Sequence, residues 1–201
     1  MKIVEVSAII LAGGRSSRMG TDKAKLRLGG KTLLDLTVEK IRHLGISDIV
    51  ISGCADCPEG TSYAPDLIPG KGPLSGIHAG LRQIRNQSSL VLPVDMPLIP
   101  EEVLKLLITA HGSDPAVARP DSAPTQPFPI TVLTLEGRME PLVAVYDASL
   151  AQDCEEILQE EKHSPRRLCD KYGYHPVPYT GDPALLINCN TPEEFAYVQR
   201  L

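Results

Sequence analysis

The sequence predicts an α/β protein with an open, mostly parallel, twisted sheet, helices on both faces, and a small antiparallel hairpin in the second half. Three observations support this prediction. Apolar runs of strand length alternate with helical patterns over residues 1–112, which is the order typical of a parallel sheet. The first apolar run ends at a pair of glycines. After residue 113 the alternation stops, and a proline-rich segment precedes two strand-like runs.

The first expected strand covers residues 4–11, an almost unbroken apolar run. A run without polar alternation indicates a strand that is buried on both faces. The first helix begins at Thr32, because Thr32 and Asp35 have the spacing of a capping box, and Gly45 ends it. Residues 48–52 form the second expected strand.

The next helix begins at Gly72 and Pro73 and places four apolar side chains on one face, namely Leu74, Ile77, Leu81 and Ile84. A third strand over residues 90–94 ends at Asp95. Pro93 has no N–H to donate, so we expect a bulge or an irregular end of the strand there. A final helix of this half begins near residue 100 and continues to about residue 111.

The second half begins with several prolines between residues 115 and 129, and we expect a mobile loop over 119–129. Residues 130–135 and 142–146 have the pattern of two strands joined through a glycine turn. Helices are expected near residues 150–158 and 164–167, followed by a late strand over 185–187 and a last helix capped by Thr191.

The composition limits the function classes. The 201-residue chain contains 42% hydrophobic and 22% charged residues, which fits one domain, 1–201. Its net charge of −5 argues against nucleic acid as a partner, because phosphate backbones need a basic surface. No apolar run approaches the ~20 residues of a membrane span, and the N-terminus lacks the apolar region of a signal peptide. We therefore expect a cytoplasmic protein without a membrane partner.

The five cysteines do not suggest a disulfide framework, because their number is odd and their spacing is irregular. Cys54 and Cys57 form a C-x-x-C pair that Pro58 and Gly60 follow. A redox pair usually begins a helix, whereas this context is typical of a loop. No second pair completes a zinc site. We expect two thiols in a surface loop.

The most informative stretch is residues 11–23, where a buried strand leads into a loop with two glycines, two arginines and a lysine: Gly13, Gly14, Arg15, Arg18 and Lys23. Glycines let backbone N–H groups approach phosphate oxygens closely, and the basic side chains can neutralise a triphosphate. The spacing fits neither a Walker A loop nor the G-x-G-x-x-G fingerprint. The alternative is a glycine turn with solvated arginines.

Asp95 follows the third strand, and Ser52 ends the second. Because the carboxyl ends of parallel strands meet at one edge of the sheet, both should lie beside the glycine loop. A carboxylate beside phosphates suits a hard divalent cation such as Mg²⁺, although an aspartate can also simply begin a turn before Pro97. Gly76 and Gly80 lie on one helical face, and something should approach closely there, either a ligand or a neighbouring element.

Residues 11–23 resemble the nucleotidyltransferase family that makes molybdenum cofactor dinucleotides, and most of all its guanylyltransferase branch. Further segments resemble the family in the same order: Asp66 ahead of residues 72–76, then 93–97, 140–142 and 188–194. The resemblance implies a nucleotidyltransferase, Rossmann-like fold. It also implies that residues 1–112 bind the nucleotide and that 113–201 face the acceptor. One departure is Ser52, where the guanylyltransferase pattern usually has Asn.

The residues and the resemblance together lead us to expect a set of nucleotide contacts from Leu11, Ala12, Gly13, Gly14, Arg15, Lys23, Ser52, Asp66, Gly76 and Asp95. Within this set, Arg15, Lys23 and Asp95 are the expected catalytic residues, and Asp95 would also hold the metal. For the acceptor we expect Asn188 and Asn190, at the end of the late strand. We also expect Arg166 and Arg167, in the first turn of a helix, where cations oppose the dipole; a solvated surface pair is the alternative.

The expected reaction transfers GMP from GTP to the phosphate of molybdopterin or the molybdenum cofactor, uses Mg²⁺ and releases pyrophosphate. The second glycine, Gly14, resembles the guanine-using branch and favours GTP over CTP. Two alternatives stay open. The chain could use CTP or load another acceptor such as a sugar phosphate, or it could be a regulatory nucleotide-binding protein without turnover.

Overall fold

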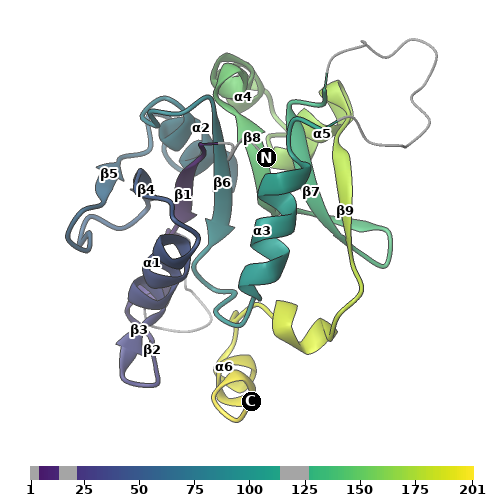
Figure 1. The fold of residues 1–201 in the computed structure, drawn as a ribbon. Helices are drawn as coiled ribbons and strands as arrows, with labels where there is room; N and C mark the ends of the chain where they lie inside the picture. The colour runs from purple at the N-terminus through teal and green to yellow at the C-terminus, as the bar shows by residue number, and fades with distance from the viewer. Residues whose placement is uncertain (1–4, 14–21, 114–126) are drawn as a thin grey trace.

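The computed structural model describes residues 5–13, 22–113 and 127–201. Its main feature is a seven-stranded sheet in the order β5-β4-β1-β6-β8-β7-β9 (Figure 1). The strands are β1 (Ser7–Leu11), β4 (Ile49–Ser52), β5 (Ser62–Ala64), β6 (Ser88–Pro93), β7 (Ile130–Leu135), β8 (Arg138–Asp147) and β9 (His175–Tyr179). A separate two-stranded antiparallel ribbon contains β2 (Arg27–Leu28) and β3 (Lys31–Thr32).

The sheet is mostly parallel, as predicted. Strands β5, β4, β1 and β6 run side by side in one direction, and β7 and β9 pair in parallel as well. Strand β8 runs antiparallel to both of its neighbours, β6 and β7. The β7–β8 pair is the expected hairpin, although β8 begins earlier than predicted and the pairing register shifts between Val132 and Leu133.

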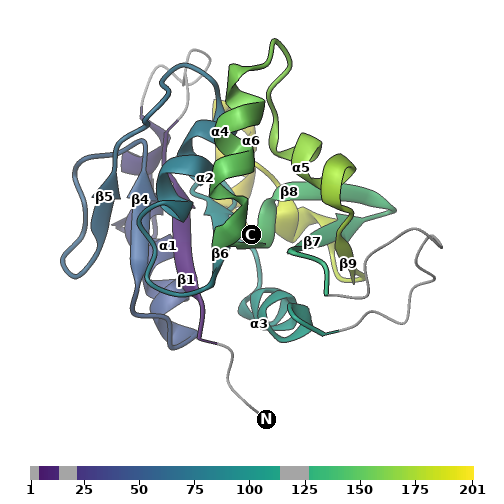
Figure 2. The ribbon, with the colours of Figure 1, turned by 90° about the horizontal axis from the view of Figure 1, so that it is seen from above.

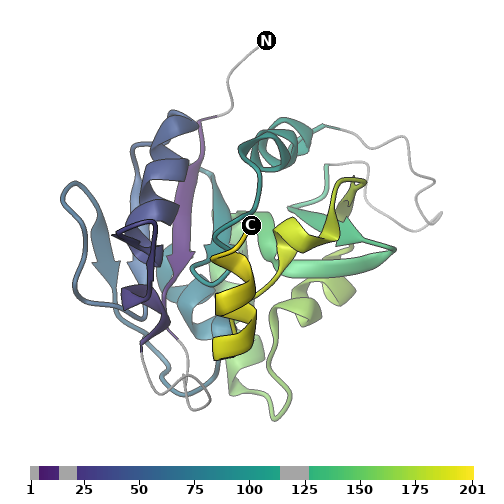
Figure 3. The ribbon, with the colours of Figure 1, turned by 90° about the horizontal axis from the view of Figure 1, so that it is seen from below.

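Helices cover both faces of the sheet, which confirms the predicted layers. Helices α1 (Leu33–His43) and α3 (Glu101–Ala110) lie on one side, and α2 (Pro73–Leu81), α4 (Ala151–Gln159) and α5 (Pro165–Tyr172) lie on the other (Figures 2 and 3). The alternation of β1 explains this division, because Ile10 belongs to the core cluster of α1 and α3, and Ile9 belongs to that of α2, α4 and α5.

Local signals start the helices where the sequence predicted. The side chain of Thr32 accepts from the Asp35 N–H at 3.0 Å, and Asp35 completes the capping box of α1. The same device begins α6 (Pro192–Val198), where Thr191 and Glu194 cap each other. Pro73 occupies the first turn of α2, since its missing N–H would have no partner there anyway. However, α2 ends at Leu81 and does not reach Ile84.

Near the carboxyl terminus one predicted strand is absent, and one observed strand was not predicted. Residues 185–187 are not a strand, because Pro183 and the cap by Asp182, which accepts from the Ala184 N–H at 2.9 Å, begin the 3₁₀ helix η3 (Pro183–Leu186). Strand β9 was missed because Pro176 and Pro178 argue against a strand. The strand is possible because β9 is the last strand of the sheet, so that the two proline nitrogens can point away from β7.

Pro93 is the last residue of β6, and the strand ends there without a bulge. The Val94 N–H donates to the Leu11 oxygen, so the nitrogen of Pro93 points to the other side, where pairing with β8 has already ended at Val91. The missing donor therefore costs no ladder bond.

Several expectations fall outside the described residues, including the start of the first strand and positions 119–126 of the predicted mobile loop. Within the described residues, no helix combines the length and the apolar character that crossing a membrane requires. The thiol prediction holds only in part, because Cys57 is half-buried whereas Cys54 is buried. Both are free thiols.

Candidate active site

The carboxyl ends of β1, β4 and β6 meet in one row. Leu11 is the register partner of both Ser52 and Pro93. The row continues past the strands, since the Ala12 N–H donates to the Ser52 oxygen at 2.8 Å and the Val94 N–H to the Leu11 oxygen at 3.1 Å. The chain leaves β1 toward β4 on one side and later returns to β6 on the other. Such a reversal opens a crevice where ligands of α/β sheets bind.

A cavity of about 860 Å³ occupies this edge. Its walls are the strand ends, the start of α2, the helix η1 (Lys23–Lys25) and the segment before α6. The lining residues are Leu11, Ala12, Gly13, Lys23, Ser52, Asp66, Gly70, Gly72, Pro73, Gly76, Pro93, Val94, Asp95, Leu142, Asn188 and Asn190. The volume is within the range that small-molecule sites span.

Two backbone segments touch at the floor of the cavity. A Cβ atom on Gly13 would lie 2.8 Å from the Cα atom of Gly53. Gly53 also has a φ of +86°, a conformation that side chains with a Cβ rarely adopt. The start of the glycine loop is therefore packed directly on the turn after β4, and neither position has room for a larger residue.

Lys23 and Asp95 form the charged centre of the cavity. The Lys23 Nζ donates to Asp95 Oδ2 at 2.7 Å and to Asn190 Oδ1 at 2.7 Å. The side chains of the ion pair are only 20% and 18% exposed. Lys23 is fixed from the amino-terminal side as well, because Asp22 caps η1 by accepting from the Ala24 N–H at 3.1 Å. Three segments that are far apart in the sequence thus meet at one ammonium group.

The segment before α6 holds Asp95 from a second side. The Cys189 N–H donates to the Asp95 backbone oxygen at 2.8 Å, and the Asn190 N–H donates to Glu194 Oε2 at 2.7 Å. Burial, and then the charges of Asp95 and Glu194, raise the pKa of the Cys189 thiol to about 11. Cys189 is thus a thiol at neutral pH and a poor nucleophile.

On the opposite wall, Ser52 donates from Oγ to Asp66 Oδ1 at 3.0 Å. Ser52 is buried, so its hydroxyl orients Asp66 and has little surface left for a ligand. Gly76 packs on it, since an added Cβ would lie 2.7 Å from Ser52 Oγ and 2.9 Å from Leu11 Cδ2. The close approach expected at Gly76 and Gly80 thus comes from β1 and β4.

Helix α2 begins at the cavity, where Gly72, Pro73 and Gly76 are lining residues. Among the residues that the structure describes, no side chain caps the first turn of α2. Helix amino termini carry partial positive charge and unpaired N–H groups, which favour anions.

The structure does not bring every expected residue to the cavity. Gly14, Arg15 and Arg18 lie outside the described residues. Arg166 and Arg167 are described but do not line the cavity. Arg167 donates to Glu160 at 2.6 Å, and Arg166 lies 3.9 Å from Asp170, so these two arginines have surface carboxylates as partners.

Six lining residues received no individual functional role from the sequence, namely Gly70, Gly72, Pro73, Pro93, Val94 and Leu142. Four of them, Gly72, Pro73, Pro93 and Val94, belong to the segments 72–76 and 93–97 that resemble the family. Leu142 belongs to the segment 140–142 that resembles the family, and this was the available signal. Gly70 has a φ of +80° and lies in the turn that leads into α2; nothing in the sequence separated it from other turn glycines.

The donor set fits a magnesium ion that phosphates help to hold. Within the described residues, no group of three or more His, Cys, Asp or Glu side chains could hold a metal ion. Mg²⁺ in nucleotide enzymes commonly takes one or two carboxylates, and phosphates and waters complete its shell. Asp95, together with Asn188 and Asn190 in the lining of the same cavity, could supply the ligands that the protein contributes.

The comparisons with known proteins agree with this geometry. Residues 8–177 match the family described as MobA-like NTP transferase domain. This chain belongs to that family. The expectation of a nucleotidyltransferase is confirmed by this membership, and the sheet with its helices is the fold expected of it.

Three relatives illustrate the similarity. A molybdenum cofactor guanylyltransferase from Rhizobium meliloti (strain 1021) is 35% identical over 93% of this chain and 87% of its own. Another, from Ectopseudomonas mendocina (strain ymp), is 30% identical over 94% of this chain and 90% of its own. The crystal structure of molybdopterin-guanine dinucleotide biosynthesis protein A from Archaeoglobus fulgidus has a TM-score of 0.73 at 21% identity and covers 97% of both chains.

Proposed function

We propose that this protein transfers GMP from GTP to the phosphate of molybdopterin or the molybdenum cofactor, with Mg²⁺, and releases pyrophosphate. The observation that supports it most is the cavity at the ends of β1, β4 and β6, which gathers Lys23, Asp95 and Asn190 around one ammonium group. The relatives named molybdenum cofactor guanylyltransferase make GTP and this acceptor the first choice of substrates.

The nucleotide would occupy the wall formed by β1, β4 and α2. Gly13 lines this wall, and the start of α2 would add partial positive charge near the phosphates. Asp66, held by Ser52, would accept hydrogen bonds from the base or ribose. Arg15 and Gly14 would complete the phosphate loop, as the sequence indicates. Lys23 would leave Asp95 and donate to the triphosphate.

The acceptor would approach from the wall formed by Leu142, Asn188 and Asn190. Its phosphate monoester is largely dianionic near neutral pH and is itself the nucleophile. No general base is then required. The side chains would align the two phosphates and neutralise the charge that moves to the pyrophosphate.

Asp95 would hold the magnesium ion together with phosphate oxygens, and the ion would supply charge neutralisation at the reacting phosphate. The partner of Asp95 in the structure is the Lys23 ammonium. Lys23 would therefore have to give up this contact when Mg²⁺ binds to Asp95.

The decisive experiment incubates the purified protein with Mg²⁺ and molybdopterin and with GTP, CTP or ATP in turn. We expect pyrophosphate and a product of the mass of the guanine dinucleotide with GTP, and less product with CTP. Reactions without acceptor control for simple hydrolysis. Faster product formation with CTP would overturn the guanylyl assignment. Nucleotide binding without pyrophosphate release, with molybdopterin and with sugar phosphates alike, would overturn the proposed transfer.

A further inference from the structure

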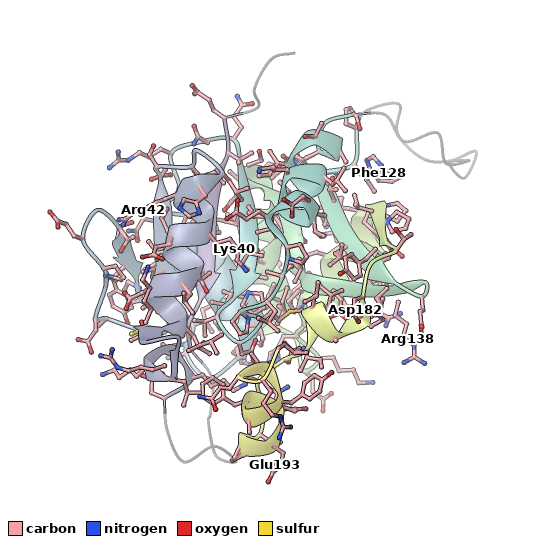
Figure 4. The ribbon with its side chains drawn as sticks, turned by 60° about the horizontal axis from the view of Figure 1, so that its bottom comes forward. Lys40, Arg42, Phe128, Arg138, Asp182 and Glu193 are labelled. Carbon is pink, nitrogen blue, oxygen red and sulfur yellow. The ribbon has the colours of Figure 1, made fainter. Side chains whose placement is uncertain are left out.

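Lys40 is a half-buried lysine whose ammonium group donates to two backbone carbonyls. It lies in α1, and its Nζ donates to the Pro97 oxygen at 2.8 Å and to the Ile99 oxygen at 2.6 Å. Figure 4 shows the labelled Lys40 side chain pointing from α1 toward the middle of the molecule. Burial lowers the pKa of Lys40 to about 8, and the negative charge of Glu101 opposes this only in part.

The two carbonyls belong to residues 94–100, which connect β6 to α3 and carry Asp95. Pro97 and Pro100 remove two N–H donors from this segment, so it has few bonds of its own. The Ile99 N–H donates to the Met96 oxygen at 3.4 Å, near the upper limit for a hydrogen bond. The Cys189 N–H binds the Asp95 oxygen from the other side. Lys40 therefore supplies two of the shortest bonds that hold this connection.

A lysine at this position is expensive for stability alone. Neighbouring positions of α1 that face the core carry Val38 and Ile41. The half-buried ammonium of Lys40 loses part of its hydration, which the two neutral oxygens replace only in part. In return, an ammonium directs several donors at once, and so it can hold two carbonyls in a defined arrangement.

We propose that Lys40 is a positioning residue for Asp95. By holding the carbonyls of Pro97 and Ile99, it fixes the course of residues 94–100 and, with it, the direction in which the Asp95 carboxylate enters the cavity. This inference rests on the proposed function, since it matters for catalysis only if Asp95 serves the transfer. Lys40 does not line the cavity, so it would act through the segment and without touching a substrate.

The test compares Lys40→Met with Arg42→Met. Arg42 is a matched control because it lies two residues further along α1 and also donates to a backbone carbonyl, that of Glu59. Glu59 and the residues next to it do not line the cavity. Figure 4 shows both side chains on α1. Each variant is examined at a temperature where circular dichroism shows it folded.

The first readout is amide hydrogen exchange, which does not depend on any activity. In Lys40→Met, residues 95–101 should exchange roughly tenfold faster or more, as expected for the loss of charge-assisted bonds, and β1 should stay protected. Arg42→Met should leave these residues unchanged. Unchanged exchange of residues 95–101 in Lys40→Met would overturn the inference.

The second readout is turnover with GTP, Mg²⁺ and molybdopterin. Lys40→Met should lower kcat roughly tenfold and raise the Mg²⁺ concentration for half-maximal rate, with GTP affinity in the presence of EDTA unchanged. Lys40→Arg should restore part of kcat and part of the wild-type Mg²⁺ requirement. Faster exchange with an unchanged kcat and Mg²⁺ requirement would reduce Lys40 to a structural residue and overturn the positioning role.

The two proposals fail in different ways. A wild-type protein without turnover contradicts the proposed function, whereas the exchange of residues 95–101 still decides whether Lys40 fixes the segment of Asp95. If Lys40→Met does not fold, Lys40→Gln replaces it, because glutamine keeps two N–H donors without the charge. The same two readouts then apply, with the same outcomes for and against.

Discussion

Asp95 and Lys23 form an ion pair in the cavity, and we propose that Asp95 binds Mg²⁺ and that Lys23 binds the triphosphate. For Asp95→Asn, we expect a folded protein with the Mg²⁺-dependent rate lowered roughly a thousandfold, because an amide is a weak ligand for a hard cation. Steady-state rates over a Mg²⁺ titration measure this. The matched control is Asp56→Asn, which removes an exposed carboxylate that pairs with Lys25. A rate close to wild type in Asp95→Asn would refute the assignment.

The neighbouring lysine gives a separate prediction. Lys23→Ala should weaken GTP binding by about 1.5–3 kcal/mol, since a charge-assisted hydrogen bond to phosphate is lost. Equilibrium titration with a fluorescent GTP analogue measures the affinity. Lys25→Ala is the control, because Lys25 lies in the same short helix but is exposed and pairs with Asp56. Equal affinities of the two variants would contradict a phosphate role for Lys23.

At the scale of elements, Gly76 and Gly80 allow helix α2 to pack closely on the sheet. Substitution of the two glycines should have different consequences. A Cβ on Gly80 would lie 2.6 Å from Ile9 Cδ1, deep under the helix, whereas one on Gly76 would meet Ser52 at the cavity. Both alanine variants should lose about 1–3 kcal/mol of unfolding free energy from overpacking, reduced by the better helix propensity of alanine. Urea denaturation measures the loss.

Only Gly76→Ala should also change nucleotide binding, because its new methyl group displaces Ser52, which orients Asp66. The GTP dissociation constant should rise for Gly76→Ala and stay near the wild-type value for Gly80→Ala. A larger rise of the GTP dissociation constant for Gly80→Ala than for Gly76→Ala would show that the Ser52–Asp66 pair does not contribute to nucleotide binding.

The elements also show what the sequence can and cannot predict. Helix starts followed from local chemistry, because a capping box such as that of Thr32 needs only residues three apart. Strand β9 could not be predicted from local chemistry. Pro176 and Pro178 are acceptable only in an edge strand, and the position of a strand in the sheet depends on distant residues. The same limit applies to Arg166 and Arg167, whose partners Asp170 and Glu160 only the folded chain reveals.

At the scale of the whole molecule, the order of the strands creates the site. The sequence predicted that the ends of the first three parallel strands would meet, and it placed Lys23, Ser52 and Asp95 there. It also placed Asn188 and Asn190 on the acceptor side of the site. It could not predict that the Cys189 N–H donates to the Asp95 oxygen or that Asn190 Oδ1 accepts from Lys23. These contacts join the two halves of the chain. They depend on the path through β9 and η3 and not on any local pattern.

Stability over pH provides the last prediction, and it concerns the whole molecule through Lys40. Its ordinary pKa is 10.5, and burial lowers the folded value to about 8. Between these two values the unfolded chain binds more protons than the folded one, so the free energy of unfolding should rise with pH as far as Lys40 is concerned. Below pH 8 both states are protonated, and the folded protein carries the full cost of the buried charge.

The difference in unfolding free energy between wild type and Lys40→Met isolates this contribution. It should shift in favour of the wild type by up to about 3 kcal/mol from pH 8 to pH 10.5. Thiols with raised pKa values, such as Cys169 and Cys189, titrate in the same region, but both proteins contain them and their effect cancels. Urea denaturation at several pH values measures the difference. A constant difference across this range would mean that Lys40 stays charged inside the fold, with Glu101 and the two carbonyls fully compensating for its burial.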